Sequence, residues 1–86
     1  MIADAFDLQK RNKLCNIRGC GRAPTKKVTI LEEDRIRKES RTLATLFLCT
    51  EHHETKMPIF ITEMNKHRET GKVITKRVQD MGFVTY

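Results

Sequence analysis

The chain has no tryptophan, and aromatic residues make up only 6% of its 86 residues. Hydrophobic residues of all kinds amount to 38%. A chain this short with so few large apolar residues usually needs a disulfide framework, a metal ion or a partner to hold it together. We therefore expect one domain, residues 1–86, with a stabilising element beyond its hydrophobic core.

Long apolar runs, internal repeats and Gly/Ser-rich linkers are missing as well. No segment approaches the ~20 apolar residues of a membrane span. The first nine residues carry Asp4 and Asp7 and lack the apolar run of a signal peptide. The absence of repeats and linkers argues against a second domain. These features predict a cytoplasmic protein without membrane contacts.

Cysteine is present in an odd number, three, whereas a secreted disulfide scaffold normally has an even number. In a reducing compartment, clustered thiols bind metal more often than they form disulfides. The sequence reads Cys15-x4-Cys20, a 28-residue interval, and Cys49-x2-His52. Two short pairs supply the four donors of a tetrahedral structural zinc site. We predict that these four residues bind one structural Zn²⁺ ion.

Several alternatives to this site remain open at the level of sequence. His53 competes with His52, because both lie about one helical turn from Cys49, and we favour His52. The cysteines could instead be small buried apolar residues, or ligate an iron–sulfur cluster. A catalytic zinc would need an open position and a general base, whereas Glu51 and Glu54 are better explained as the first turn of a helix. We expect neither an enzyme nor a small-molecule substrate.

The segments around the cysteines indicate turns and strands. Gly19 and Gly21 flank Cys20, and glycine tolerates the positive φ values of a tight metal-binding knuckle. Residues 27–31 and 42–48 are rich in β-branched or alternating apolar residues and predict two strands. The charged residues 32–41 would join them as a protruding hairpin. A helix over residues 31–43 is the alternative.

A helix is expected after Cys49, with Thr50 as its N-cap and Pro58 restarting or kinking it. Apolar residues at helical spacing form one stripe: Met57, Phe60, Ile61 and Met64. Gly71 is a predicted stop. We expect a helical extension over residues 55–86, including a short helix through Val73, Ile74, Val78 and Met81 that ends near Gly82. Residues 83–86 would add an edge strand, and residues 1–14 a short helix before Cys15.

The segments Cys15-Asn-Ile-Arg-Gly-Cys20-Gly and Leu48-Cys49-Thr-Glu-His52 resemble the knuckle and helix start of treble-clef zinc fingers. They are also similar to small stand-alone zinc proteins of bacteria and phages. The resemblance covers residues 15–54, the zinc core, and departs from the commonest pattern in its four-residue first gap. It implies an α+β domain in which a zinc knuckle and a β-hairpin precede a helix. It implies little about function, because this architecture hosts many roles.

Charge indicates a polyanionic partner. The net charge is +6, and residues 1–27 hold seven Lys or Arg against two Asp, which gives +5. A basic surface attracts nucleic acid, so we predict a nucleic-acid-binding protein of transcription regulation or genome maintenance. The predicted contacts are Lys10, Arg11, Lys13, Arg18, Arg22, Lys26 and Lys27. Alternatively, this surface is merely solvated, or Lys13, Arg18 and Arg22 balance the negative charge of a zinc–thiolate site.

The main alternative function is a protein–protein interaction module, or a small regulator that docks on a host enzyme complex. The expected hairpin end mixes cations, among them Arg35, Arg37 and Lys38, with acids, and such a surface suits a protein as well as a phosphate backbone. If the stripe from Met57 to Met64 were exposed, it would favour a partner or self-association. DNA, RNA or protein as the partner, and a monomer or a homodimer, all remain open.

Overall fold

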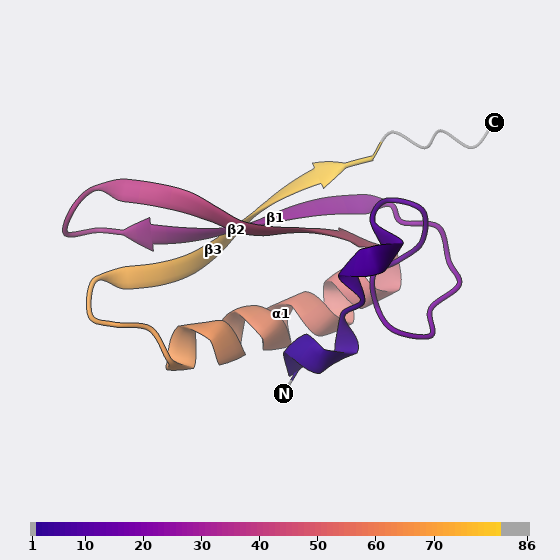
Figure 1. Ribbon diagram of the computed structural model, residues 1–86, viewed down its shortest axis with the longest axis horizontal. Coiled ribbons are helices and arrows are strands. Elements are labelled where there is room, and N and C mark those ends of the chain that lie inside the picture. Colours follow the sequence, from indigo (N-terminus) through magenta and orange to yellow (C-terminus); the bar gives the residue numbers. More distant parts are fainter. Residues whose placement is uncertain (1, 82–86) are drawn as a thin grey trace.

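A computed structural model of the chain describes residues 2–81, with side chains from residue 4 onward. Within these residues the fold is α+β, with one three-stranded antiparallel sheet in the order β2-β1-β3 and one long helix, α1. The helix and the amino-terminal segment lie against the same face of the sheet (Figure 1). The expected amino-terminal helix is instead two short 3-10 helices, η1 (Ile2–Ala5) and η2 (Leu8–Lys10).

The predicted hairpin is present and is longer than expected. Strand β1 (Lys26–Asp34) pairs with β2 (Glu39–Leu48), and the register runs from Lys26 opposite Leu48 to Asp34 opposite Glu39. The charged residues therefore extend the ladder. Their side chains alternate between the two faces of the sheet, and Glu32, which points towards the core side, forms an ion pair with Arg41.

The predicted carboxy-terminal helix is wrong, because residues 72–80 form strand β3 (Lys72–Asp80). All nine of its residues pair with β1, which becomes the central strand. Three β-branched residues in a row, Val73, Ile74 and Thr75, favour this extended state. Without β3, one edge of β1 would be unpaired. The expected helical extension over residues 55–86 thus holds only as far as Lys66, and the expected strand over 83–86 lies outside the described residues.

Helix α1 (Thr50–Lys66) begins one residue earlier than predicted, with Cys49 rather than Thr50 as its N-cap. Pro58 lies inside this single helix and does not restart it. A proline in this position removes one backbone hydrogen bond, and Met57 and Phe60 on either side of it are buried against the core. The helix ends before Gly71, which has a φ of +89° in the turn that leads into β3.

The hydrophobic core fills the space between α1 and the sheet. Val28, Ile30 and Leu48 of the hairpin are almost fully buried. The apolar stripe of α1 packs here, because Met57 and Phe60 are buried and the other two residues of the stripe lie partly buried against them. The ring of Phe60 meets that of Phe6 edge-on, with 5.1 Å between the centroids, which fastens the amino-terminal segment to the helix. Over residues 2–81, no helix is both long and apolar enough to span a bilayer.

Candidate metal centre

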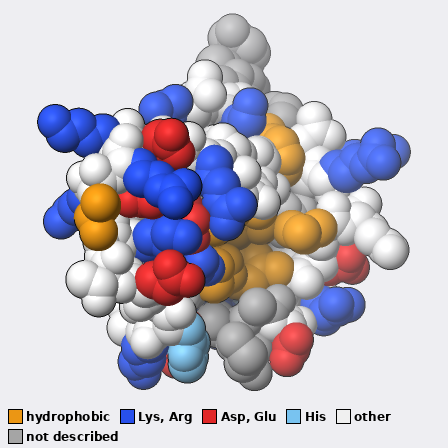
Figure 2. Space-filling model, turned by 60° about the vertical axis from the view of Figure 1, so that its left-hand side comes forward, with side chains coloured by type: hydrophobic (Ala, Val, Ile, Leu, Met, Phe, Trp, Pro, Cys, Tyr) orange, Lys and Arg blue, Asp and Glu red, His pale blue; other side chains and the backbone are white. Residues whose placement is uncertain are grey.

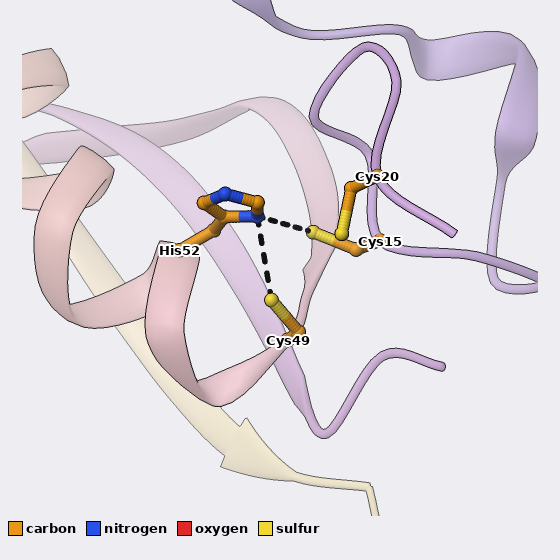
Figure 3. Close-up of side chains that lie close together, drawn as sticks. All are labelled: Cys15, Cys20, Cys49 and His52. Atoms are coloured by element: carbon orange, nitrogen blue, oxygen red, sulfur yellow. Dashed lines mark hydrogen bonds between the residues drawn. The ribbon is translucent and has the colours of Figure 1, made fainter. Parts of the chain in front are cut away.

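Three cysteines and one histidine converge at the end of the sheet where α1 begins (Figure 3). Cys15 and Cys20 belong to the loop before β1, Cys49 joins β2 to α1, and His52 lies in the first turn of α1. Their four candidate donor atoms all lie within 4.8 Å of one another. The two pairs that are separated by 28 residues in the sequence are therefore brought together by the hairpin between them.

The distances within the cluster suit tetrahedral coordination. Nδ1 of His52 lies 3.4 Å from Sγ of Cys15 and 3.3 Å from Sγ of Cys49. Zinc–nitrogen and zinc–sulfur bonds of ~2.0–2.1 and ~2.3 Å at a tetrahedral angle put a nitrogen and a sulfur ligand about 3.5 Å apart. These two nitrogen–sulfur separations are close to this value. The cluster could hold one metal ion.

Burial makes the cluster a costly place for thiolates without a cation. Cys15 and Cys49 are buried, whereas Cys20 and His52 are partly exposed. Burial raises the pKa of the Cys15 thiol to about 11. Burial also acts to raise the pKa of Cys20, but hydrogen bonding to the Arg22 backbone and the neighbouring thiols outweighs it, so that this pKa is lowered. A bound metal ion would favour the thiolate form of all three cysteines.

The knuckle that presents Cys15 and Cys20 is fixed by backbone hydrogen bonds. Cys15 N–H donates to the carbonyl of Arg22 at 2.9 Å, and Cys20 N–H donates to the carbonyl of Ile17 at 3.1 Å. Of the two glycines that flank Cys20, only Gly19 has a positive φ, +79°. This glycine lets the chain turn sharply enough for both cysteines to face His52.

Lys10 has a part in the knuckle that the sequence did not indicate. Its Nζ donates to the carbonyl oxygen of Ile17 at 2.6 Å and to that of Cys20 at 3.0 Å. The ammonium group thereby joins η2 to the turn that carries a candidate ligand. The partners lie seven and ten residues away in an irregular loop, so no local sequence pattern could have predicted the contact.

The competing histidine points away from the cluster. His53 lies next to β3, with its Nε2 3.5 Å from Nζ of Lys76. Burial, together with the positive charges of Lys76 and Lys26, lowers the pKa of His53. His67 is exposed just after the end of α1. Among the described histidines, only His52 joins the three cysteines.

The seven predicted nucleic-acid contacts do not share one environment. Besides Lys10, three of these cations have partners within the chain. Arg18 donates through Nε to the carbonyl of Asp4 at 2.8 Å, Arg22 pairs with Glu51, and Lys26 pairs with Asp80. Lys26 and Lys27 are consecutive in β1, so their side chains point to opposite faces of the sheet. Arg11 and Lys13 are exposed.

Comparisons of the chain with protein-family models, with curated proteins and with solved structures found no significant match. What the chain does must therefore be inferred from its own residues.

Proposed function

We propose that the chain is a non-enzymatic, zinc-stabilised domain of treble-clef type that binds nucleic acid. The observation that carries the proposal is the convergence of Cys15, Cys20, Cys49 and His52, with donor atoms within 4.8 Å of one another. Knuckle, hairpin and helix follow one another in the treble-clef order, and β3 is an addition to that order. We also propose that the chain is related to the small zinc proteins of bacteria and phages that its sequence resembles.

The donor set favours zinc among the common metals. Thiolate and imidazole ligands in a tetrahedral arrangement suit Zn²⁺, and four protein donors leave no position for a substrate. Glu51, the acidic residue nearest in sequence to His52, forms an ion pair with Arg22. These features support a closed structural site rather than a catalytic one. When bound, the metal would tie the knuckle to the end of β2 and the start of α1.

A structural metal would also compensate for the small number of large apolar residues in the chain. The core contains few large side chains, and its largest fully buried members are Ile30, Leu48, Met57 and Ile74. Metal binding contributes folding energy where an apolar core is small. We infer that the amino-terminal segment and knuckle depend most on the metal, since their loops contain only short 3-10 turns.

Nucleic-acid binding is supported by the net charge of +6 on only 86 residues. Such an excess attracts a phosphate backbone over a Debye length. The competing proposal of a protein-interaction module loses one of its two supports, because the apolar stripe from Met57 to Met64 packs against the core, and the mixed-charge hairpin is the support that remains. A role in transcription or genome maintenance, in the cytoplasm, is part of this proposal and depends on nucleic-acid binding.

The zinc site can be tested by native mass spectrometry on two neighbouring variants. Wild type and His53→Asn should carry one zinc per chain, whereas His52→Asn should lose it or hold it far more weakly. His53 is the matched control, because it is adjacent in α1 but faces Lys76. Equal zinc content in the two variants would refute the ligand assignment.

Nucleic-acid binding can be tested by the salt dependence of affinity for duplex DNA, single-stranded DNA and RNA. If about six phosphates are neutralised, a plot of log binding constant against log salt concentration should have a slope of about −5. A slope near zero on all three probes would refute the proposal.

A further inference from the structure

We propose that the tip of the β1–β2 hairpin, residues 35–38, is the element that enters the major groove of duplex DNA. This inference rests on the proposed nucleic-acid function and names the surface and the form of nucleic acid. It moves the contact away from residues 10–27, where four of the seven cations expected from the sequence have partners within the chain.

The hairpin end looks mixed in charge in the sequence, but the fold gives two of its four acids, Glu32 and Asp34, partners within the chain. Glu32 is only 5% exposed, and its carboxylate accepts hydrogen bonds from Nε of Arg41 at 3.1 Å and from Nη1 of Arg68 at 2.5 Å. Oδ1 of Asp34 accepts the backbone N–H groups of Ile36 and Arg37, both at 3.1 Å. The first of these acids is therefore neutralised inside the molecule, and the second is turned back to the hairpin's own backbone.

The cations of the tip remain available. Arg35, Arg37 and Lys38 are exposed, and none of them forms an ion pair with a carboxylate within residues 2–81. Figure 2 shows Lys and Arg side chains gathered, with Asp and Glu among them, on the end of the molecule that carries the tip. Three cations within four residues give a local charge that attracts phosphate.

An apolar side chain stands between these cations. Ile36 is 74% exposed, more than any other large hydrophobic residue of the described chain. An isoleucine exposed to this extent leaves most of its apolar surface free for a partner. In a DNA major groove, an apolar side chain can contact the methyl group of thymine, while arginine binds guanine or phosphate. Ile36 with Arg35 and Arg37 matches this pair of interactions.

The tip is held in a defined conformation. The N–H of Arg35 donates to the carbonyl of Gly71 at 2.8 Å. The side chain of Ile36 lies over the same glycine, since a Cβ built on Gly71 would be only 2.6 Å from its Cδ1. Lys38 adopts a φ of +56° to close the turn. Such preorganisation lowers the entropy that a binding loop would lose on contact with a partner.

The shape of the molecule also favours a groove. The hairpin tip lies at one end of the long axis, beyond the end of α1 (Figure 1), in a molecule of 46 × 26 × 21 Å. The major groove of B-form DNA is about 12 Å wide and admits a two-stranded β-ribbon, whereas that of A-form RNA is too deep and narrow for side chains to read. Duplex DNA is therefore the partner that fits this tip.

The test uses fluorescence anisotropy of a labelled ~20-base-pair DNA duplex, with the full zinc-loaded chain. The tip variant is Arg35→Gln/Arg37→Gln/Lys38→Gln. The control variant, Arg11→Gln/Lys13→Gln/Arg77→Gln, removes the same three charges from exposed sites elsewhere. Zinc content and far-ultraviolet circular dichroism establish that both variants fold. The tip variant should bind at least about tenfold more weakly than the control, with a log–log salt slope less steep by about 2.7.

Two further variants test whether binding depends on the structure of the tip and not only on the net charge of the chain. Ile36→Ser should weaken duplex binding severalfold without changing the salt slope, because no phosphate contact is lost. Glu39→Gln, which removes an exposed acid beside the tip, should tighten binding. Equal affinities of the tip and control variants would overturn the assignment of the surface while leaving nucleic-acid binding intact. No binding of the wild type to any nucleic acid would overturn the proposed function itself. Preference for single strands, or binding to anionic phosphatidylserine vesicles instead of DNA, would overturn the choice of partner.

Discussion

Asn16 forms a pair of hydrogen bonds with the backbone of Phe47 at the outer edge of β2, one through its side-chain oxygen and one through its own backbone N–H. Phe47 N–H donates to Oδ1 of Asn16 at 2.9 Å, and Asn16 N–H donates to the carbonyl of Phe47 at 2.7 Å. Nδ2 of Asn16 also donates to the carbonyls of Arg11 and Leu14, at 2.7 and 3.2 Å. Asn16 directly follows Cys15, so this residue attaches the knuckle to the sheet.

We predict that Asn16→Ala lowers the free energy of unfolding of the zinc-loaded protein by about 3 kcal/mol, because three side-chain hydrogen bonds are lost in a buried site. Urea denaturation measures the change. Asn12→Ala, at an exposed position in the same loop, is the control and should stay within about 0.5 kcal/mol of wild type. A comparable loss in both variants would show that Asn16 has no special role.

At the opposite edge of the sheet, Asn65 binds outer backbone groups of β3 in a similar way. Oδ1 of Asn65 accepts the N–H of Ile74 at 2.8 Å, and its Nδ2 donates to the carbonyls of Ile74 and Ile61, at 3.2 and 3.1 Å. One asparagine from the knuckle and one from the end of α1 thus each satisfy backbone groups on an outer strand. At these two positions, the outer backbone groups are not available for pairing with another chain.

A buried carboxylate gives the second prediction. Glu32 lies between Arg41 and Arg68, and Nε of Arg68 is buried without a hydrogen-bond partner. Glu32→Ala should destabilise the protein by about 3 kcal/mol, because the guanidinium of Arg68 loses its counter-charge in a partly buried site. Glu33→Ala is the control, since the neighbouring carboxylate has only a 3.4 Å contact with Thr75. The midpoint temperature of thermal unfolding should fall strongly for Glu32→Ala and hardly at all for Glu33→Ala. Equal shifts of the two midpoints would contradict the prediction.

The turn before β3 gives the third prediction. Gly71→Ala should destabilise the protein by about 1–2 kcal/mol from its left-handed backbone, and by a smaller further amount because the exposed end of the Ile36 side chain must move away from the new Cβ. The double variant Gly71→Ala/Ile36→Ala should recover the second part but not the first. Gly21→Ala should be nearly neutral, because Gly21 lacks a positive φ and a Cβ there meets nothing within 4 Å.

Metal removal gives the fourth prediction. A strong chelator should abolish cooperative unfolding of the knuckle and of the amino-terminal segment, because their attachment depends on Cys15 and Cys20. Backbone hydrogen exchange should then rise first for residues 5–25 and least for the centre of β1, which pairs on both sides. Unchanged exchange in the knuckle after complete metal removal would contradict a structural role for the metal.

Local patterns account for what the sequence predicted well. The spacing of the two ligand pairs, the β-branched residues of the hairpin and the helical stripe after Cys49 are each readable within a few residues. Strand β3 was missed because Val73, Ile74, Val78 and Met81 do not separate the helical from the extended period in so short a segment, and pairing with β1 decides between them. The expected restart of the helix at Pro58 was wrong, because the packing of the helix against the core outweighs one lost hydrogen bond.

Buried polar contacts could not have been predicted from the sequence. The environments of Lys10, Asn16 and Glu32 depend on partners that the fold brings in, such as Phe47 for Asn16 and Arg68 for Glu32. Lys10 shows the consequence for function, because a cation assigned to phosphate from charge alone binds carbonyls of the knuckle instead.

The most direct test of the central claim is X-ray absorption at the zinc K-edge on the protein purified with its metal. We predict a first shell of three sulfur atoms at about 2.3 Å and one nitrogen at about 2.0–2.1 Å, with an imidazole outer shell. His52→Asn should remove the imidazole signal and His53→Asn should leave it. A shell of oxygen and nitrogen atoms, a shell with four sulfurs, or the absence of stoichiometric zinc would contradict the proposal that Cys15, Cys20, Cys49 and His52 form one closed metal site.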